Sequence, residues 1–446
     1  MAFPKTLEET LAELNIQENG AMKTVENAKD KVYCQLCVTT LTISRLSSLK
    51  DHCKTDMHVK RRNLRAIRNE GMEHDNYDFR FELCKVMVAA DMPWHKLEIP
   101  EFRNFLEFNL GTKLPCRKTL STTYLDKLYN EAISSMKQQL STGPIWASVD
   151  GTTDVVGRPV ATVIIGQLDK NQFHKPFMAN CEFLDGPENS KRVVKLLEDT
   201  LQEYNIKPAE MKLLVSDAVS YMLTAGQILK KRNLKMIHVT CIVHGFHRVC
   251  ETIRVLFPKA NKWITALKKI FKKSPLRVMR FKQKNPKLAL PPQPVTTRWG
   301  TWLVAAIYHD TNYEAVCNVI KDLDPEDADS IQQAQELMKD PAVKEEMAFI
   351  AKHLTFFIYT IKNLEEQGLT LAEQLQYYED AKIQMKKIPG DYGKNIRSKM
   401  TKVEERNPGI KQLLQVRDLQ LGWPGGYTPL IDCLKYGNTT SVDCER

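Results

Sequence analysis

The amino-acid sequence predicts a multidomain α+β protein, with a small Cys/His unit, a short helical region, a mixed α/β sheet and a large all-α part. Three observations favour this class. Cysteines, histidines and basic residues gather at 31–68, short segments rich in β-branched residues alternate with turns over 144–248, and apolar residues recur at helical spacing over 249–430. At 446 residues, the chain is long enough for two or three domains of ordinary size.

The composition excludes several classes of protein. No run of about 18 apolar residues occurs, so we expect no transmembrane helix and no membrane partner. The N-terminus lacks the basic start and apolar stretch of a secretory signal. The 11 cysteines are spread singly rather than in a disulfide framework. Together with a CxxC motif and 10 histidines, they predict an intracellular protein with reduced thiols and a metal site.

The first third of the chain divides into three parts. Residues 1–30 predict an acidic, weakly helical lead-in, and residues 31–68 form the Cys/His unit. A polar joint, "NEGMEHDNYD", precedes the helical region at 79–140. Within that region "PEFRNFLEF" places Pro100 in the first turn of a helix, where the missing N–H costs nothing.

The period of the apolar residues changes at 144. Three short strands in a meander are expected from "PIWASVDGT", "VATVIIGQL" and "KPFMANCEFL". A helix in "NSKRVVKLLEDTLQEY", a strand in "KLLVSD", a helix from Ala218 to Lys231 and a strand in "MIHVTCIVH" follow. This order predicts a sheet over 144–248 with an antiparallel and a parallel side. Residues 249–430 predict helices interrupted by a Pro-rich linker, and 431–446 are expected to return to the sheet.

The Cys/His unit has the spacing of a metal site. Cys34 and Cys37 form a CxxC turn, 14 residues separate Cys37 from His52, and five more separate His52 from His58. Two thiolates and two imidazoles can complete a tetrahedron around Zn²⁺, and such a filled site is structural rather than catalytic. Cys53 is an alternative ligand to His52. The competing interpretation is a redox CxxC loop beside histidines that only decorate the surface.

Basic residues gather in two places. The segment 259–287 carries 11 Lys or Arg and no acid, and "KRRNLRAIR" follows the second histidine directly. Such runs are either solvated faces or surfaces that neutralise phosphates and release counterions. The net charge of +10 agrees with either interpretation. As contacts to DNA phosphates we expect Lys60, Arg61, Arg62, Lys268, Lys269, Lys272 and Lys273.

Two carboxylates follow predicted strands. "ASVDGTTD" ends a strand at Asp150, and "LLVSDAVSYM" ends another at Asp217. If these strands are parallel neighbours, both carboxylates lie at one edge of the sheet. Convergent carboxylates of this kind can hold the divalent cations used in phosphoryl transfer. Alternatively, each Asp is a turn residue or a helix N-cap.

Several motifs in order resemble the hAT transposase family. They are Asp150, Asp217 in an SDxxxxM context, the CxxH of Cys241 and His244, the pair Arg298 and Trp299, and Glu445 in "TTSVDCER". The segment "AADMPWHKLEIPEFRNFLEF" also resembles the one that precedes the catalytic domain in that family. The resemblance covers residues 30–446, nearly the whole chain.

The resemblance implies a BED- or U1-type finger that grips nucleic acid, and an RNase H-like core with an all-α insertion. It further implies Mg²⁺ at Asp150, Asp217 and Glu445, DNA contacts at Arg298 and Trp299, and a structural CxxH. The family's "ER" opens a longer helix, so we expect Glu445 to be held poorly at the end of this chain.

We therefore expect a nuclear DNA-binding protein from a domesticated transposable element, with impaired catalysis and no small-molecule substrate. The alternative is an active Mg²⁺-dependent transposase that cuts and joins DNA. We expect DNA and a second copy of the chain, in a homo-oligomer, as partners. A third alternative is a pure oligomerisation scaffold whose helical insertion mediates self-association.

Overall fold

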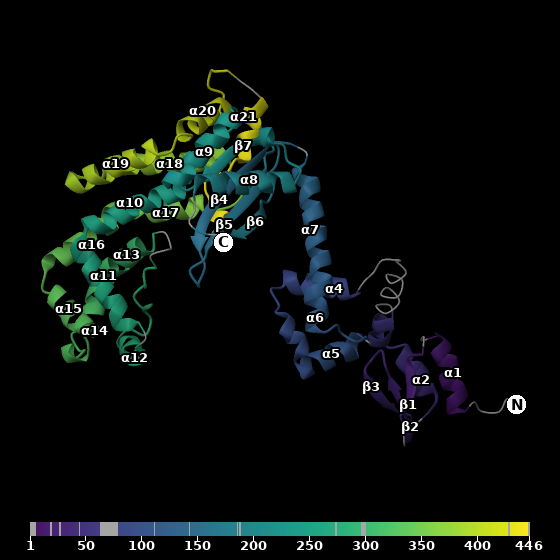
Figure 1. Cartoon of the computed structure of the whole chain (residues 1–446). Helices are drawn as coiled ribbons and strands as arrows, with labels where there is room; N and C mark the ends of the chain where they lie inside the picture. Colours follow the sequence, from purple (N-terminus) through teal and green to yellow (C-terminus); the bar gives the residue numbers. More distant parts are fainter. Residues whose placement is uncertain are drawn as a thin grey trace. The chain divides into compact units, whose positions relative to one another are not determined.

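The computed structural model describes residues 6–17, 20–25, 28–43, 45–62, 79–110, 112–141, 143–184, 186, 189–272, 274–295, 300–426 and 429–444. The chain forms two compact units, Met1–Glu131 and Ala132–Arg446 (Figure 1). One three-stranded and one five-stranded sheet accompany many helices. The predicted α+β class, with a small sheet and a larger mixed sheet, is confirmed.

The N-terminal part of the first unit is a three-stranded antiparallel sheet with two helices. Its elements are α1 (Leu7–Gln17), β1 (Met22–Val25), β2 (Ala28–Cys34), β3 (Thr39–Thr42) and α2 (Ser47–Cys53). Val32 and Cys34 alternate along β2 toward the core, where they meet Leu11 and Leu14 of α1. The expected boundary at residue 30 lies inside β2, so residues 7–25 belong to the same small fold as the CxxC turn.

The rest of the first unit is helical, as expected for 79–140. Its elements are α4 (Phe79–Ala89), η1 (Trp94–Glu98), α5 (Pro100–Leu110), α6 (Arg117–Thr119), η2 (Leu120–Tyr124) and the start of α7 (Leu125–Leu140), which ends in the second unit. Pro100 begins α5, which confirms the helix start predicted from the sequence. A small core of Cys84, Met87, Leu97 and Leu120 holds these elements together.

The second unit contains the mixed sheet. Its strands are β4 (Ile145–Thr153), β5 (Pro159–Gln167), β6 (Phe177–Phe183), β7 (Met211–Ser216) and β8 (Ile237–Thr240). They lie in the order β6-β5-β4-β7-β8, with β4–β5 and β5–β6 antiparallel and β4–β7 and β7–β8 parallel. The predicted antiparallel and parallel sides are therefore both present.

Helices cover both faces of this sheet. On one face Ala147, Val149 and Leu214 pack against α8 (Ser190–Glu203) and α9 (Ser220–Arg232). On the other face Trp146 and Val215 join a large core shared with α10 (Ile242–Leu256) and the helices that follow it (Figure 1). Alternate residues of each strand serve the two faces, as the pleat of a β-strand requires.

Helices occupy most of the remaining chain. They are α11 (Pro258–Phe271), α12 (Pro275–Lys284), α13 (Thr301–Thr311), α14 (Tyr313–Ile320), α15 (Asp329–Leu337), α16 (Pro341–His353), α17 (Phe356–Leu364), α18 (Leu371–Lys387), α19 (Gly390–Glu405), α20 (Ile410–Gln420) and α21 (Pro429–Cys433). Short turns η3 (Pro208–Glu210), η4 (Pro325–Asp327), η5 (Leu434–Tyr436) and η6 (Val442–Cys444) complete the unit.

One predicted strand is too long. The strand expected in "MIHVTCIVH" ends at Thr240, and α10 begins at Ile242. Cys241 is the N-cap of α10, because its Sγ accepts a hydrogen bond from the backbone N–H of His244 at 3.5 Å. A sulfur cap lies outside the usual Ser, Thr, Asp and Asn signals, so the β-branched residues around it favoured the strand instead.

Candidate functional site

Four side chains of the first unit converge on one point that could hold a metal ion. They are Cys34, Cys37, His52 and His58, whose ligand atoms all lie within 4.8 Å of one another. Cys34, Cys37 and His58 are buried, and His52 is half-buried. All four residues predicted from the spacing are therefore brought together. His52 rather than Cys53 joins the cluster, which favours His52 of the two ligands that the sequence left open.

The distances between these atoms match a tetrahedral zinc site. Bond lengths of about 2.3 Å to sulfur and about 2.05 Å to nitrogen place two nitrogens about 3.3 Å apart, and nitrogen and sulfur about 3.6 Å apart. His52 Nε2 lies 3.2 Å from His58 Nδ1, which lies 3.5 Å from Cys34 Sγ and 3.4 Å from Cys37 Sγ. The donor set and these three distances thus fit Zn²⁺.

Local structure explains how the ligands meet. The CxxC turn joins β2 to β3, and the backbone N–H of Cys37 donates to Cys34 Sγ at 3.4 Å. Val38 follows with φ of 52°, a conformation that costs a β-branched residue on the order of 1–3 kcal/mol. Arg61 Nη1 donates to Leu36 O at 3.1 Å, which ties the helical residues 56–62 to this turn.

The protonation state of the thiols depends on a cation. Burial, followed by the neighbouring Cys34, raises the pKa of Cys37 to about 11. A bound metal reverses this preference because only thiolates ligate. Two sulfurs and two imidazoles fill a tetrahedron and leave no position for substrate, so such an ion would stabilise the fold rather than carry out chemistry.

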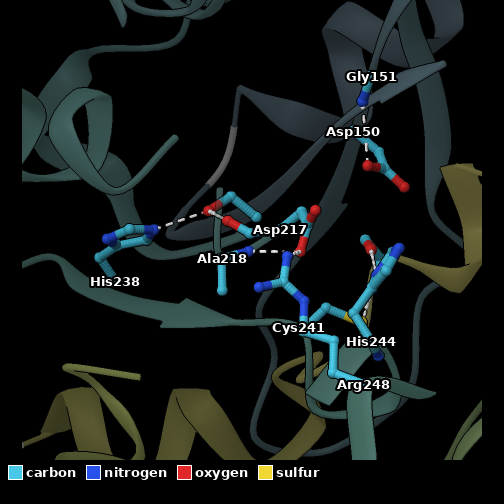
Figure 2. A network of polar contacts seen from close by, with 10 residues as sticks. Asp150, Gly151, Asp217, Ala218, His238, Cys241, His244 and Arg248 are labelled. Atoms are coloured by element: carbon cyan, nitrogen blue, oxygen red, sulfur yellow. Dashed lines mark hydrogen bonds and ion pairs between the residues drawn. The ribbon is translucent and has the colours of Figure 1, made fainter. Parts of the chain in front are cut away.

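The two predicted carboxylates lie at one edge of the sheet in the second unit. Strands β4 and β7 are parallel neighbours with Val149 opposite Ser216. Asp217 directly follows β7, as predicted, whereas Asp150 lies within β4, which continues to Thr153 in its pairing with β5 instead of ending at Asp150. Both carboxylates lie on the side of the sheet that α10 covers (Figure 2). Asp217 is not a helix cap, because the N-cap of α9 is Val219.

Each of these carboxylates already has a partner. Asp150 Oδ1 accepts from the backbone N–H of Gly151 at 3.0 Å, and Asp217 Oδ1 accepts from that of Ala218 at 2.5 Å. Arg248 of α10 also forms an ion pair with Asp217, from Nη2 to Oδ1 at 2.9 Å (Figure 2). The Asp217 side chain is only 19% exposed. A divalent cation at this edge would therefore compete with the guanidinium for Asp217.

The CxxH motif holds the C-terminal segment against the start of α10. The backbone N–H of Ser441 donates to Cys241 Sγ at 3.2 Å, and Ser441 Oγ lies 3.2 Å from His244 Nδ1. Within the described part of the chain, the only Cys, His and carboxylate cluster with metal-ligand spacing is the one in the first unit. Cys241 and His244 thus hold the segment by hydrogen bonds, and the structural role predicted for them stays a prediction.

Further contacts fix the same segment. Thr439 is fully buried and donates through its N–H and hydroxyl to Gln374 Oε1, at 3.0 and 2.6 Å. Cys444 Sγ lies 3.6 Å from Ser148 Oγ on β4, and burial raises the pKa of its thiol. Glu445 lies outside the described residues, so its predicted role and its predicted fraying stay predictions. Residues 439–444, which precede it, are buried or half-buried and hydrogen-bonded.

Three other predicted contacts, Lys273, Arg298 and Trp299, also lie outside the described residues. The predicted position of Trp299 near the acidic edge therefore stays a prediction.

The basic segment 259–287, which contains no acid, is partly neutralised by partners from elsewhere in the chain. Lys259 pairs with Asp340 at 2.5 Å, and Lys284 pairs with Asp322. Lys268 donates to the carbonyl of Pro294. Lys269 and Lys272 are exposed, as are Lys60 and Arg61 of the first unit, whereas Arg62 is half-buried. The run is thus in part a structural, solvated face, which was one of the two interpretations of its sequence.

Sequence reasoning missed the ion pair between Arg248 and Asp217 and the clamp at Gln374. Their partners lie 31 and 65 residues away, and no short motif marks them. The helical spacing of Lys399, Lys402 and Arg406 was a visible signal of a basic helix face. The neighbouring glutamates lower the net charge of that segment and so hid the signal.

No protein-family model and no curated protein matches this chain. None of the described helices combines the length and the apolar character that crossing a membrane requires.

Proposed function

We propose that this chain is a nuclear zinc-finger DNA-binding protein derived from a hAT-type transposase. The observation that carries the proposal is the Cys/His cluster in the first unit, with three basic residues starting two positions after its last ligand. Lys60, Arg61 and Arg62 lie on the same helical segment as the ligand His58. A metal at the cluster would fix this segment and present the basic side chains to phosphates, which supply most non-specific affinity for DNA.

Descent from a transposase is supported by the second unit. Its sheet joins an antiparallel meander to two parallel strands and so resembles an RNase H-like core. The motifs of Asp150, Asp217, Cys241 and His244 occur along it in the order of the hAT family. The finger and short helical region also resemble those of the CGG triplet repeat-binding protein, a host protein that resembles a domesticated hAT element. In this proposal the protein acts by occupying DNA, for instance at transcribed genes.

Impaired catalysis is supported by the state of the acidic edge. Arg248 neutralises Asp217, so the pair of carboxylates presents less negative charge to Mg²⁺ than two free acids would. Binding then remains as the activity of the chain.

The proposal is tested by measuring DNA affinity of the full chain as a function of salt. Replacing Lys60, Arg61 and Arg62 together by Gln should lower the slope of log K against log[salt] by up to about 2.7, at about 0.9 per phosphate contact. Zinc content is measured alongside, because Arg61 also donates to the CxxC turn. The matched control replaces three exposed lysines of the helical region, which are Lys85, Lys96 and Lys118.

Two results would contradict DNA binding through the finger. One is an affinity that does not change between 50 and 200 mM salt, where about six to ten phosphate contacts cost a factor of 10³–10⁵. The other is a control variant that loses as much affinity as the finger variant, because net charge alone would then explain the loss.

A second candidate, an active Mg²⁺-dependent transposase, is favoured by the meeting of Asp150 and Asp217 at one sheet edge. In that function Glu445 would complete the metal site. Strand cleavage by the full chain in Mg²⁺, abolished by Asp150→Asn and by Glu445→Gln, would place this function first. Absence of cleavage with intact DNA binding would support the proposal above.

A further inference from the structure

A basic cavity lies beside the acidic edge of the second unit. Neither DNA binding by the finger nor strand cleavage at the carboxylates assigns it a role. Its volume is about 410 Å³, and it lies between the start of α10 and the last turns of α19. Its charged lining consists of Arg248, Lys399, Lys402 and Arg406, with Glu405 as the one carboxylate. Ala218, the neighbour of Asp217, also lines the cavity.

The cations of α19 lie on one face of the helix. Lys399, Lys402 and Arg406 follow a spacing of three and four residues, which places them one above another on successive turns. Lys399 is half-buried, and Lys402 and Arg406 are exposed. Across the described residues, none of these three side chains forms an ion pair or a hydrogen bond. By contrast, Lys382 of α18 is neutralised by Glu404 in the last turn of α19, at 2.5 Å.

The fold holds this basic face in place. Asn407 follows α19 and clamps the end of β8, since its Nδ2 donates to Thr240 O at 2.9 Å and its Oδ1 accepts from Thr240 N at 3.1 Å. Gly245 lets α10 and α19 approach closely, because a Cβ there would lie 2.9 Å from Val403 Cγ1. The cations are therefore brought to the carboxyl edge of the sheet by rigid elements rather than by a loop.

Three unpartnered cations around one concavity repel one another, and a low-dielectric wall strengthens that repulsion. An anion relieves it. The guanidinium of Arg248 donates one N–H to Asp217 and has further donors for an oxyanion in the cavity. Lysine ammonium groups on successive turns form a row of positive charges. Such a row matches a chain of phosphates better than it matches a single carboxylate, which carries its charge in one place.

We propose that this cavity binds backbone phosphates of a nucleic acid strand and guides the strand to the edge where Asp150 and Asp217 lie. The inference rests on the proposed DNA binding and assigns it a second contact surface, on the second unit. Phosphate contacts of this kind position a strand without reading its sequence. The cavity thus contributes affinity and register on the strand, and the finger in the first unit contributes its own contacts independently.

The test compares two charge-matched variants of the full chain. One replaces Lys399, Lys402 and Arg406 by Gln. The other replaces Lys386, Lys387 and Lys394 by Gln, which are exposed on α18 and α19 and do not line the cavity. Arg248 stays unchanged because it holds Asp217. Each set removes three positive charges from exposed or half-buried positions, so the fold should survive, and urea unfolding of both variants checks this.

Binding of a fluorescein-labelled single strand is measured by anisotropy between 50 and 200 mM salt. The cavity variant should lower the slope of log K against log[salt] by about 1–2, since single strands lose about 0.7 per phosphate contact, and the control should lower it by less than about 0.7. Equal slopes for the two variants, with normal binding by the unaltered chain, would overturn the inference and leave the proposed function intact. An unaltered chain that binds no DNA at 50 mM salt would overturn both.

A second experiment distinguishes binding of a nucleic acid strand from binding of a small phosphorylated ligand. The probe is adenosine triphosphate alone, titrated into the unaltered chain and the cavity variant, because a cavity of 410 Å³ also lies in the size range of small-molecule sites, about 300–1,000 Å³. Loss of affinity for the strand, with weaker or equal effect on triphosphate binding, supports the proposal. Loss of triphosphate binding with unchanged strand affinity would reassign the cavity to a nucleotide and overturn it.

Discussion

Two buried histidines make the second unit sensitive to mild acid. His309 is fully buried in the helical core, and neither ring nitrogen has a hydrogen-bond partner within the described residues. Burial lowers the pKa of His309 to about 3. His238 is 3% exposed under α9, and burial together with the charge of Lys230 lowers its pKa to about 4. Both side chains are therefore neutral in the folded chain at any pH above about 4.

The sign of the effect follows from the unfolded chain. An unfolded histidine binds its proton near pH 6.5, whereas these two bind it only near pH 3 and 4 when folded. Stability is therefore complete above pH 6.5 and falls as the pH drops below it. At pH 5, which is 1.5 units lower, each histidine costs about 2 kcal/mol, and the pair costs about 4 kcal/mol. That is a large fraction of the 5–15 kcal/mol of a typical domain.

The assay is urea unfolding at pH 7 and pH 5, followed by tryptophan fluorescence. Trp263 reports on the site, because its ring centroid lies 6.2 Å from that of His309. The variant His309→Leu should lose about 2 kcal/mol less than the unaltered chain between the two pH values. His353→Leu, at a half-buried position, controls for the removal of a histidine as such.

The reasoning is refuted if the unaltered chain and His309→Leu lose the same stability between pH 7 and pH 5. Carboxylates do not confuse this comparison. Both chains carry the same carboxylates, including Glu346, whose pKa is raised by burial, so their contributions cancel in the difference between the two chains.

Three further predictions concern the metal site and the packing of α9 against His238. Metal analysis should find one zinc per chain, which Cys37→Ser removes and Cys53→Ser retains; loss of zinc from the second variant would reassign the ligand. Zinc removal should also unfold the three-stranded sheet, because apparent zinc affinities of about 10–16 kcal/mol in such small folds are folding energy. Gly226→Ala should destabilise the second unit by about 1–3 kcal/mol in urea, since its Cβ would lie 2.1 Å from His238 Nδ1. Gly426→Ala, with nothing within 4 Å, should be neutral, and an equal loss in both variants would contradict the packing argument.

Local signals determined a large part of the fold. The sequence predicts strands β4 to β7 and the helix start at Pro100 from the spacing of apolar residues and from turn residues. These signals are local, because the backbone geometry of a strand or helix sets the spacing of its apolar residues within a few positions. The metal cluster was also visible in the sequence. Its ligands span 25 residues, from Cys34 to His58, and the CxxC spacing by itself brings two of them together.

Only the tertiary structure decided how the charges are used. The run at 259–287 contains no acid, yet Asp340, the N-cap of α16, and Asp322, which follows α14, neutralise part of it. Nothing near Asp217 in sequence indicates that Arg248 neutralises it.

The C-terminal segment gives the same result. The Ser441 contact with Cys241 joins residues 200 positions apart. Such partners are selected by the packing of whole helices against the sheet, and the identity of a side chain does not encode which distant element will face it. The sequence therefore determined which residues could bind a metal or an anion, and the packing determined which of them remain available to do so.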